Sequence, residues 1–182
     1  MPDRTDAQHN HARILETAAA ALAEDGDVSL NSIAKRAGVG PGTLYRHFPT
    51  REALVLAVYR TEVGKVVDWA PELLAEEPPP VALRRWFLRL AHYVVLKRGL
   101  GDALTKAGHA AAIEQTRDPV LGAISLILRA GEADGTLRRG LDPDDVLLMM
   151  SCLWRVPPGS GGEQQAERLL DILVPGFAPP AP

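Results

Sequence analysis

Residues 29–48 read SLNSIAKRAGVGPGTLYRHF, and the next six residues read PTREAL. Ser29 can cap a helix through its hydroxyl, and apolar residues then recur at helical spacing up to the glycine at position 38. Gly38 can end that helix because glycine tolerates a left-handed backbone. A further helix is expected to begin near Gly40–Pro41 and to stop before Pro49. The pattern predicts two short helices joined by a tight turn.

Helical periodicity also dominates the rest of the chain, without the alternation of apolar and polar residues that marks a strand. A first helix has its apolar stripe at Ile14, Leu15, Ala18, Ala19 and Leu22. Thr50 is a good N-cap for a long fourth helix that carries apolar residues toward Trp69. We expect an all-α protein of about nine helices, with a helix-turn-helix domain at residues 1–50 and a helical domain at residues 51–182.

Prolines mark the expected helix boundaries after position 77. Residues 78–80 are three consecutive prolines, which predict a non-helical connector. Asp118–Pro119 and Asp142–Pro143 each predict a helix start, with aspartate as the cap and proline in the first turn. Residues 157–162 predict a flexible break before the last helix. Apolar residues cover almost every side of the helix after Pro143, which therefore requires burial all round.

Composition narrows the class of protein. The chain has 182 residues, 46% of them hydrophobic, which is enough for a real core. Its single cysteine, Cys152, allows neither an intramolecular disulfide nor a zinc site with several thiolates. The N-terminus does not resemble a secretory signal, and no apolar run reaches the roughly 18 residues of a membrane span. We expect a cytoplasmic protein without a membrane partner.

The net charge of −3 hides an uneven distribution. No acidic residue occurs from position 28 to 51, whereas four cations fall in that window: Lys35, Arg36, Arg46 and Arg51. This indicates a local cationic face. On charge alone, a solvated helix surface explains the window equally well.

The segments IAKRAGV at residues 33–39 and GTLYRHF at residues 42–48 are more specific. Together with the capped helix that follows, they resemble the N-terminal DNA-binding domain of the TetR family of transcriptional repressors. Roughly the first quarter of the chain carries this resemblance, and the remainder resembles the family only in its helical layout. The resemblance implies a homodimer formed through the last two helices, a double-stranded DNA operator, and a small-molecule effector in the C-terminal domain.

The residues of the third helix divide into two faces. Leu44 and Phe48 are four positions apart and are expected to pack inward. Thr43 and Arg46 then project outward, while the hydroxyl of Tyr45 can reach a phosphate from the rim. Small residues at the helix start allow a close approach to the duplex, and the free amides there favour a phosphate.

By resemblance, Gly42 and Thr43 would face base edges beside Pro41, and Tyr45 and His47 would contact the DNA backbone. Arg51 matches a position at which the family commonly carries a phosphate-binding Lys or Arg. The expected DNA-binding residues are Ser29, Asn31, Gly40, Pro41, Gly42, Thr43, Tyr45, Arg46, His47 and Arg51. Lys35 and Arg36 are explained equally well by a solvated face of the second helix.

Apolar and aromatic residues after position 68 are candidates for a pocket that binds a largely apolar effector, with His92 or His109 as polar groups that fix the ligand. They are Trp69, Trp86, Phe87, His92, Tyr93, His109, Ile113, Met149 and Trp154. Core packing is the alternative role for each residue taken singly. The two apolar helices near the C-terminus likewise either close their own core or contact a second copy of the chain.

Other classes of function have weaker support. The sequence contains no Gly-rich phosphate loop, His-Glu-x-x-His helix or nucleophile elbow, which argues against an enzyme. Its five histidines and one cysteine are scattered, so we expect neither a metal ion nor a cofactor.

A DNA-binding dimer without a small effector, controlled by a protein partner or by its own abundance, remains the alternative. Repression is the default expectation, although activators of such families use the same motif.

Overall fold

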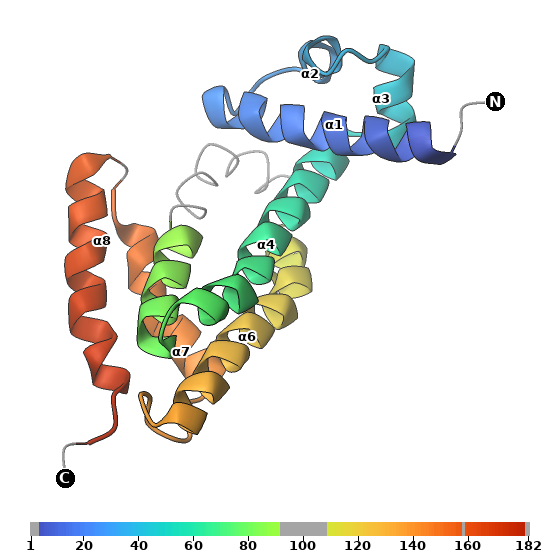
Figure 1. Cartoon of the computed structure of the whole chain (residues 1–182). Helices are drawn as coiled ribbons and strands as arrows, with labels where there is room; N and C mark the ends of the chain where they lie inside the picture. Colours follow the sequence, from blue (N-terminus) through green and yellow to red (C-terminus); the bar gives the residue numbers. More distant parts are fainter. Residues whose placement is uncertain (1–3, 92–108, 158, 181–182) are drawn as a thin grey trace. The chain divides into compact units, whose positions relative to one another are not determined.

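The computed structural model describes the backbone of residues 4–91, 109–157 and 159–180 (Figure 1). Every regular element among these residues is a helix, including two short 3₁₀ helices. The predicted all-α class is therefore confirmed in the part of the chain that the structure describes. None of the described helices is both long enough and apolar enough to cross a membrane.

The chain divides into two compact units. The N-terminal unit comprises Met1–Glu62 and Leu96–Gln115, and the C-terminal unit comprises Val63–Val95 and Thr116–Pro182. Helix α4 contributes residues to both units, because it extends from Arg51 to Glu76.

The N-terminal unit contains the predicted helix-turn-helix. It is built from α1 (Arg4–Glu24), α2 (Leu30–Arg36), α3 (Pro41–His47) and the beginning of α4. Figure 1 shows α1 running along one side of α2 and α3. The core of the unit consists of fully buried apolar side chains from all three helices: Ile14, Ala18, Leu22, Ile33 and Leu44. Leu15 is buried as well, so the predicted apolar stripe of the first helix is confirmed except at Ala19, which is half-buried.

Helix α4 begins as expected and ends later. The Ala53 amide donates to the Thr50 hydroxyl at 3.1 Å, which caps the helix. Its buried face carries Leu54, Val55, Val58, Tyr59, Val63 and Val66. The helix then continues beyond Trp69 and through Pro71 to Glu76.

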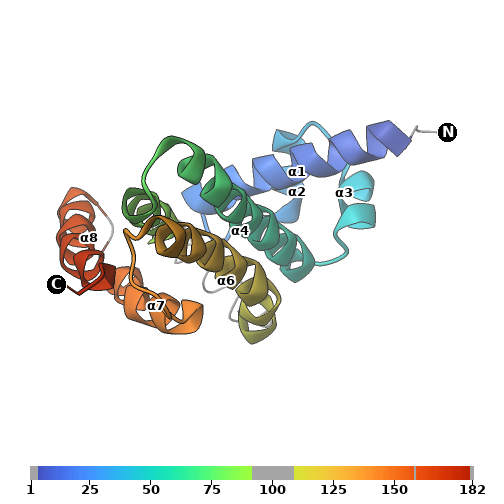
Figure 2. The same ribbon diagram turned by 60° about the horizontal axis from the view of Figure 1, so that its bottom comes forward.

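The C-terminal unit packs several helices around an aromatic and aliphatic core. The described elements after α4 are a helix at residues 79–91, α6 (His109–Asp134), α7 (Pro143–Met150), η1 (Ser151–Arg155), α8 (Ser160–Leu173) and η2 (Pro175–Phe177). All of them belong to this unit except the beginning of α6, up to Gln115. In both Figure 1 and Figure 2, α7 lies between α6 and α8. The largest fully buried side chains include Trp86, Phe87, Ile124 and Phe177.

Two of the boundaries predicted from prolines are wrong. Pro79 and Pro80 are not part of the connector, because the helix at residues 79–91 already includes them. The first turn of a helix accepts proline since its N–H groups have no partner within the helix. Pro119 does not start a helix either, because α6 is continuous from His109 to Asp134 and contains it. The hydrogen bond that Pro119 cannot donate is offset by the apolar side chains that α6 buries after it, such as Val120, Ile124 and Ile127.

The Asp142–Pro143 boundary is confirmed. The Asp144 amide donates to the Asp142 carboxylate at 2.8 Å, and Pro143 is the first residue of α7. The helix is shorter than the apolar run that predicted it, because residues after Met150 form η1. Within the single chain α7 is not buried all round, since Leu148 is 72% exposed and Met149 is 47% exposed.

The glycine-rich break before the last helix is shorter than predicted. Helix α8 begins at Ser160, so Gly161 and Gly162 are helical. A Cβ atom at Gly162 would lie 1.7 Å from the Pro157 carbonyl oxygen, whereas one at Gly161 would have no atom within 4 Å. Only glycine at position 162 therefore allows the start of α8 to approach the preceding loop this closely.

Candidate nucleic-acid interface

Helix α2 begins and ends through the local chemistry expected from its sequence. The Ser32 amide donates to the Ser29 hydroxyl at 3.2 Å. Gly38 has φ +63°, the left-handed conformation that ends the helix, and the Val39 amide then donates to the Ala34 carbonyl at 3.0 Å. The turn between the two helices is therefore fixed by backbone hydrogen bonds as well as by glycine.

Helix α3 presents two faces, as predicted. Gly40 is its extended N-cap, and Pro41 occupies the first turn. Leu44 is fully buried and Phe48 is 3% exposed, so this face joins the core. The opposite face is open to solvent, with Tyr45 44% exposed.

The remaining expected DNA contacts are also accessible on α2 and α3. Asn31, Pro41, Gly42 and Arg46 are exposed, whereas Thr43 and His47 are half-buried. Ser29 is exposed too, although its hydroxyl already accepts the amide of Ser32. Added Cβ atoms at Gly40 and Gly42 would meet no atom within 4 Å. These two glycines are thus not required by packing within the chain, which is consistent with space left for a ligand.

His47 lies beside a second histidine that sequence reasoning did not single out. The imidazole of His11 on α1 is 5.5 Å from that of His47, in an edge-to-face arrangement. Partial burial, and then the charge of His47, hold the pKa of His11 below its ordinary value. The structure therefore favours neutral His11.

Arg51 has a role that sequence reasoning missed. Its guanidinium donates two hydrogen bonds to backbone carbonyls of the loop between α1 and α2, one to Val28 and one to Gly26. The two partners lie 23 and 25 positions earlier in the chain, so local sequence carries no signal of them. The guanidinium thus connects the first residue of α4 to the segment that leads into α2.

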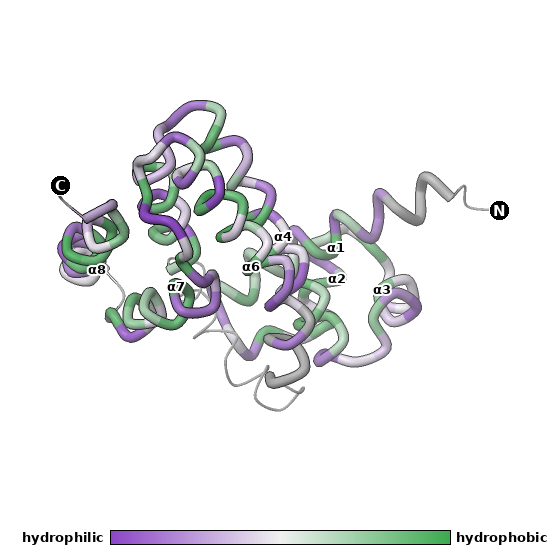
Figure 3. The backbone as a smooth tube through the Cα atoms, turned by 90° about the horizontal axis from the view of Figure 1, so that it is seen from below, coloured by the Kyte–Doolittle hydropathy of each residue, from purple (hydrophilic) through white to green (hydrophobic). Residues whose placement is uncertain are grey.

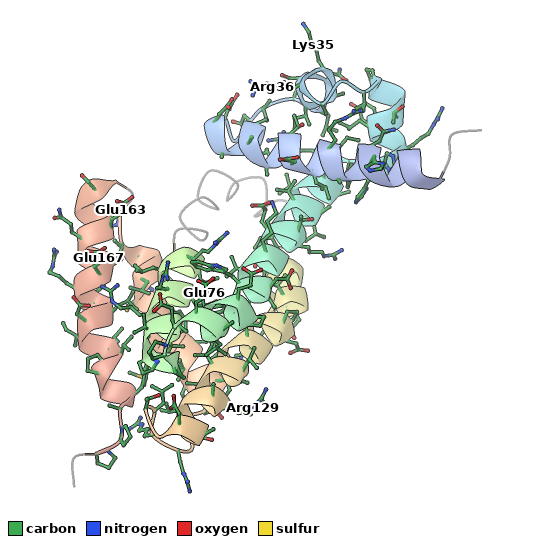
Figure 4. All side chains as sticks on the ribbon, in the orientation of Figure 1. Lys35, Arg36, Glu76, Arg129, Glu163 and Glu167 are labelled. Carbon is green, nitrogen blue, oxygen red and sulfur yellow. The ribbon has the colours of Figure 1, made fainter. Side chains whose placement is uncertain are left out.

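The two cations of α2 differ in their surroundings. Arg36 donates to Glu24 at the end of α1, with 2.7 Å between guanidinium nitrogen and carboxylate oxygen. Both side chains are exposed, so the ion pair contributes about 1 kcal/mol or less to stability. Figure 4 shows Lys35 extending away from α2. Lys35 is the freer of the two to meet an approaching polyanion.

Four of the expected effector residues have described side chains in the C-terminal unit: Trp69, Trp86, Phe87 and Met149. Trp86 and Phe87 are fully buried and meet edge to face, with ring centroids 5.2 Å apart. The Trp86 indole N–H donates to the Val66 carbonyl at 2.7 Å. Trp69 is half-buried, and the Arg89 guanidinium lies 4.1 Å from its ring centroid. These contacts make Trp86 and Phe87 parts of the core.

The fourth described candidate, Met149, belongs to α7. Met149 is on the exposed side of α7. His92 and Tyr93 lie outside the described residues, as do the side chains of His109, Ile113 and Trp154. Among the described residues, no three His, Cys, Asp or Glu side chains gather as a metal site.

The last helices carry exposed apolar side chains. Leu148 and Met149 on α7 are exposed, and Ile172 on α8 is 73% exposed. Figure 3 shows hydrophobic residues along both helices. Arg84 connects the helix at residues 79–91 to α8, because its guanidinium donates to the Asp171 carboxylate at 3.0 and 3.1 Å.

Comparison with known proteins connects both units to one family. Residues 14–58 match the family of bacterial regulatory proteins called tetR. Residues 78–179, more than half of the chain, match the C-terminal domain of transcriptional regulators that are SbtR-like. The chain belongs to the TetR family of transcriptional regulators.

Solved TetR-family structures share its fold over nearly the whole chain. The regulator SCO0520 from Streptomyces coelicolor is 37% identical, with a TM-score of 0.79, and the match covers 94% of this chain and 99% of that one. A TetR regulatory protein from Mycobacterium vanbaalenii is 34% identical, with a TM-score of 0.77 and coverage of 97% and 99%. The resemblance first seen at residues 33–48 thus extends to the C-terminal unit.

The curated relatives match a smaller part of the chain. The HTH-type transcriptional regulator SAR0097 of Staphylococcus aureus (strain MRSA252) is 38% identical over 76 residues. This match spans 40% of this chain and 40% of that protein.

Proposed function

We propose that this TetR-family regulator is a ligand-responsive repressor that binds a near-palindromic operator as a homodimer in the cytoplasm. Residues 1–50 form its DNA-binding domain, and residues 51–182 form its effector-binding and dimerisation domain. The observation that carries the proposal is the exposed outer face of α3, opposite the buried Leu44 and Phe48.

In this proposal α3 enters the major groove. Gly42 and Thr43, beside Pro41, face the base edges, and Tyr45 and His47 contact the phosphate backbone. The absence of acidic residues from position 28 to 51 favours this approach because the duplex is a polyanion. Since the first residues of α3 are small, much of the affinity is electrostatic, and Arg46, Asn31 and DNA shape supply specificity.

Dimerisation through α7 and α8 is supported by their exposed apolar residues. Leu148 and Ile172 each expose more than two thirds of their surface. Burying a Leu or Ile side chain contributes about 1.5–3 kcal/mol, which favours a second copy of the same surface as the partner. Two α7–α8 pairs form a four-helix contact.

Release from DNA follows when an apolar effector binds the C-terminal unit. The effector stabilises the state that cannot bind DNA, so its affinity for that state exceeds its affinity for the DNA-bound state. Trp69 is half-buried, unlike Trp86 and Phe87, and we propose it as an effector contact.

The packing of Trp86 and Phe87 favours a second candidate function. Both side chains are fully buried against their own chain, as expected for a core that needs no ligand. In this alternative the dimer binds DNA without a small effector and responds to a protein partner or to its own abundance. A thermal-shift screen with apolar compounds separates the candidates, because a true inducer both stabilises the protein and weakens its DNA binding.

The operator is found by selecting duplexes from a random pool with the purified full-length protein. We expect a near-palindromic site whose half-sites are separated by about 34 Å, one helical turn, or a related helical spacing. If the pool yields no preferred sequence at any salt concentration, the specific-repressor proposal is wrong.

A further inference from the structure

The contacts of Arg51 indicate a role other than the phosphate contact that the family resemblance implies. This role rests on the proposed DNA binding. We propose that Arg51 is a positioning residue that holds the beginning of α2 against the beginning of α4, and not a phosphate ligand. The observation behind this proposal is that the Arg51 guanidinium donates hydrogen bonds to the carbonyls of Gly26 and Val28.

The guanidinium of Arg51 is directed toward the loop between α1 and α2. Its two terminal nitrogens, Nη1 and Nη2, each donate to one of these carbonyls, and the side chain is half-buried. The guanidinium is planar, so the edge that carries both nitrogens faces the protein loop. A phosphate approaching from the duplex would have to displace these bonds or accept a different edge.

The loop contains a carbonyl, that of Val28, which requires a hydrogen-bond donor. The Val28 amide donates to the Asp25 carbonyl at 3.1 Å, and the Val28 side chain is buried. Its carbonyl sits at a partly buried contact and has its hydrogen bond from Arg51. Carbonyls in such places need a partner, so removing the guanidinium frees the loop from α4.

The loop leads directly into α2, and Arg51 lies at the start of α4. Val28 immediately precedes Ser29, the N-cap of α2, and Asn31 lies in the first turn of that helix. Arg51 immediately follows Thr50, the cap of α4. The guanidinium therefore fixes the first turn of α2 relative to α4, independently of the turn at Gly38 that fixes α2 relative to α3.

Lysine at position 51 separates the two roles. The Arg51→Lys variant keeps the charge that a phosphate contact needs but loses the planar fork that reaches two carbonyls. We expect Arg51→Lys to bind the selected duplex about tenfold more weakly, with unchanged binding to scrambled DNA and an unchanged salt slope. The affinity refers to the active fraction, measured by stoichiometric titration, so that loss of folded protein alone would not change it.

Hydrogen exchange in the free protein gives a readout that does not depend on DNA. In Arg51→Lys, the amides of residues 25–33 should exchange about tenfold faster, because the loop and first turn of α2 open more often. Arg36→Lys is the matched control, since it conserves charge in the same unit at an exposed ion pair. That control should leave both readouts within about twofold of the wild type.

The opposite results overturn the proposal. If Arg51→Lys binds the duplex as tightly as wild type while Arg51→Gln lowers the salt slope by about 0.9, Arg51 is a phosphate ligand. Unchanged exchange of residues 25–33 in Arg51→Lys also overturns it. If the wild type selects no DNA sequence, the repressor proposal fails on its own, whereas the exchange experiment still decides whether Arg51 holds the loop.

Discussion

The imidazole of His11 on α1 stacks on the ring of Phe48 at the end of α3, with ring centroids 5.0 Å apart and an interplanar angle of 28°. His47 completes this group at 5.5 Å from His11. The contact joins the first helix to the helix proposed to read DNA. The contact favours neutral His11, because partial burial and then the neighbouring His47 lower the pKa of its imidazole.

Stability of the N-terminal unit should therefore depend on pH through His11. Burial and then His47 lower its pKa, so the folded chain binds this proton less readily than the unfolded chain. The contribution is fully present above the unfolded pKa of about 6.5 and is lost as the pH falls below it toward the lowered folded pKa. His11→Phe keeps an aromatic ring and should lose less thermal stability than wild type between about pH 7.5 and pH 5.5.

His9 supplies the control for this pH series, because it is an exposed histidine on the same helix. His9→Gln should follow the wild-type pH dependence. An identical pH dependence in His11→Phe and wild type would show that the His11 contact does not couple protonation to folding.

Trp86 should contribute to stability through both packing and its indole N–H. Replacing it by Phe removes the hydrogen bond to Val66 and part of the buried ring system, at a cost of about 1–3 kcal/mol in the free energy of unfolding. Urea denaturation measures this change. Val81→Ala, at an exposed position of the same helix, should change it by about 0.5 kcal/mol or less, and equal effects of both variants would contradict the assignment of Trp86 to the core.

Two neighbouring glycines of α8 should respond in opposite directions to alanine. Gly162→Ala places a Cβ against the Pro157 carbonyl and should destabilise the protein by about 2 kcal/mol or more. Gly161→Ala has open space around the new Cβ and should stabilise it by about 0.5–1 kcal/mol, because alanine favours the helix. Thermal unfolding compares them. A harmless Gly162→Ala would mean that the loop before α8 is not tightly apposed to the helix.

Introducing charged residues on the exposed faces of α7 and α8 should weaken the dimer. Combining Leu148→Glu with Ile172→Glu would bury two charges in the proposed interface, which should raise the dimer dissociation constant at least about a hundredfold. Sedimentation velocity over a concentration series measures it. Val81→Glu introduces the same charge at another exposed apolar position and should leave the dimer intact. A double variant that remains as dimeric as wild type would place the interface elsewhere.

The helix-turn-helix could be predicted because its signals are local. Ser29 and Gly38 act on backbone groups within a few positions of themselves, and both do so in the structure. Helical spacing likewise predicted which residues of α3 are buried. The exposure of Tyr45 follows directly from the burial of Leu44 and Phe48 on the opposite face.

The wrong predictions concern features that depend on packing between parts of the chain and not on local sequence. Proline at position 119 normally indicates a helix start, yet α6 continues through it. The bonds from Arg51 to the loop could not be predicted either, because they join residues that are far apart in sequence. Exposure of Leu148 and Met149 is a property of the folded chain that a helical pattern alone does not determine.

The central claim, that the outer face of α3 binds a specific operator, is tested most directly by binding isotherms over a range of salt concentrations. The selected duplex is compared with a scrambled one, for wild type and for the variant Arg46→Gln. We predict at least about a thousandfold preference for the selected duplex, binding that weakens with salt, and a lower specific affinity for Arg46→Gln. Equal affinity of the wild type for both duplexes, or unchanged binding by a variant that combines Arg46→Gln with Tyr45→Ala, would contradict the account.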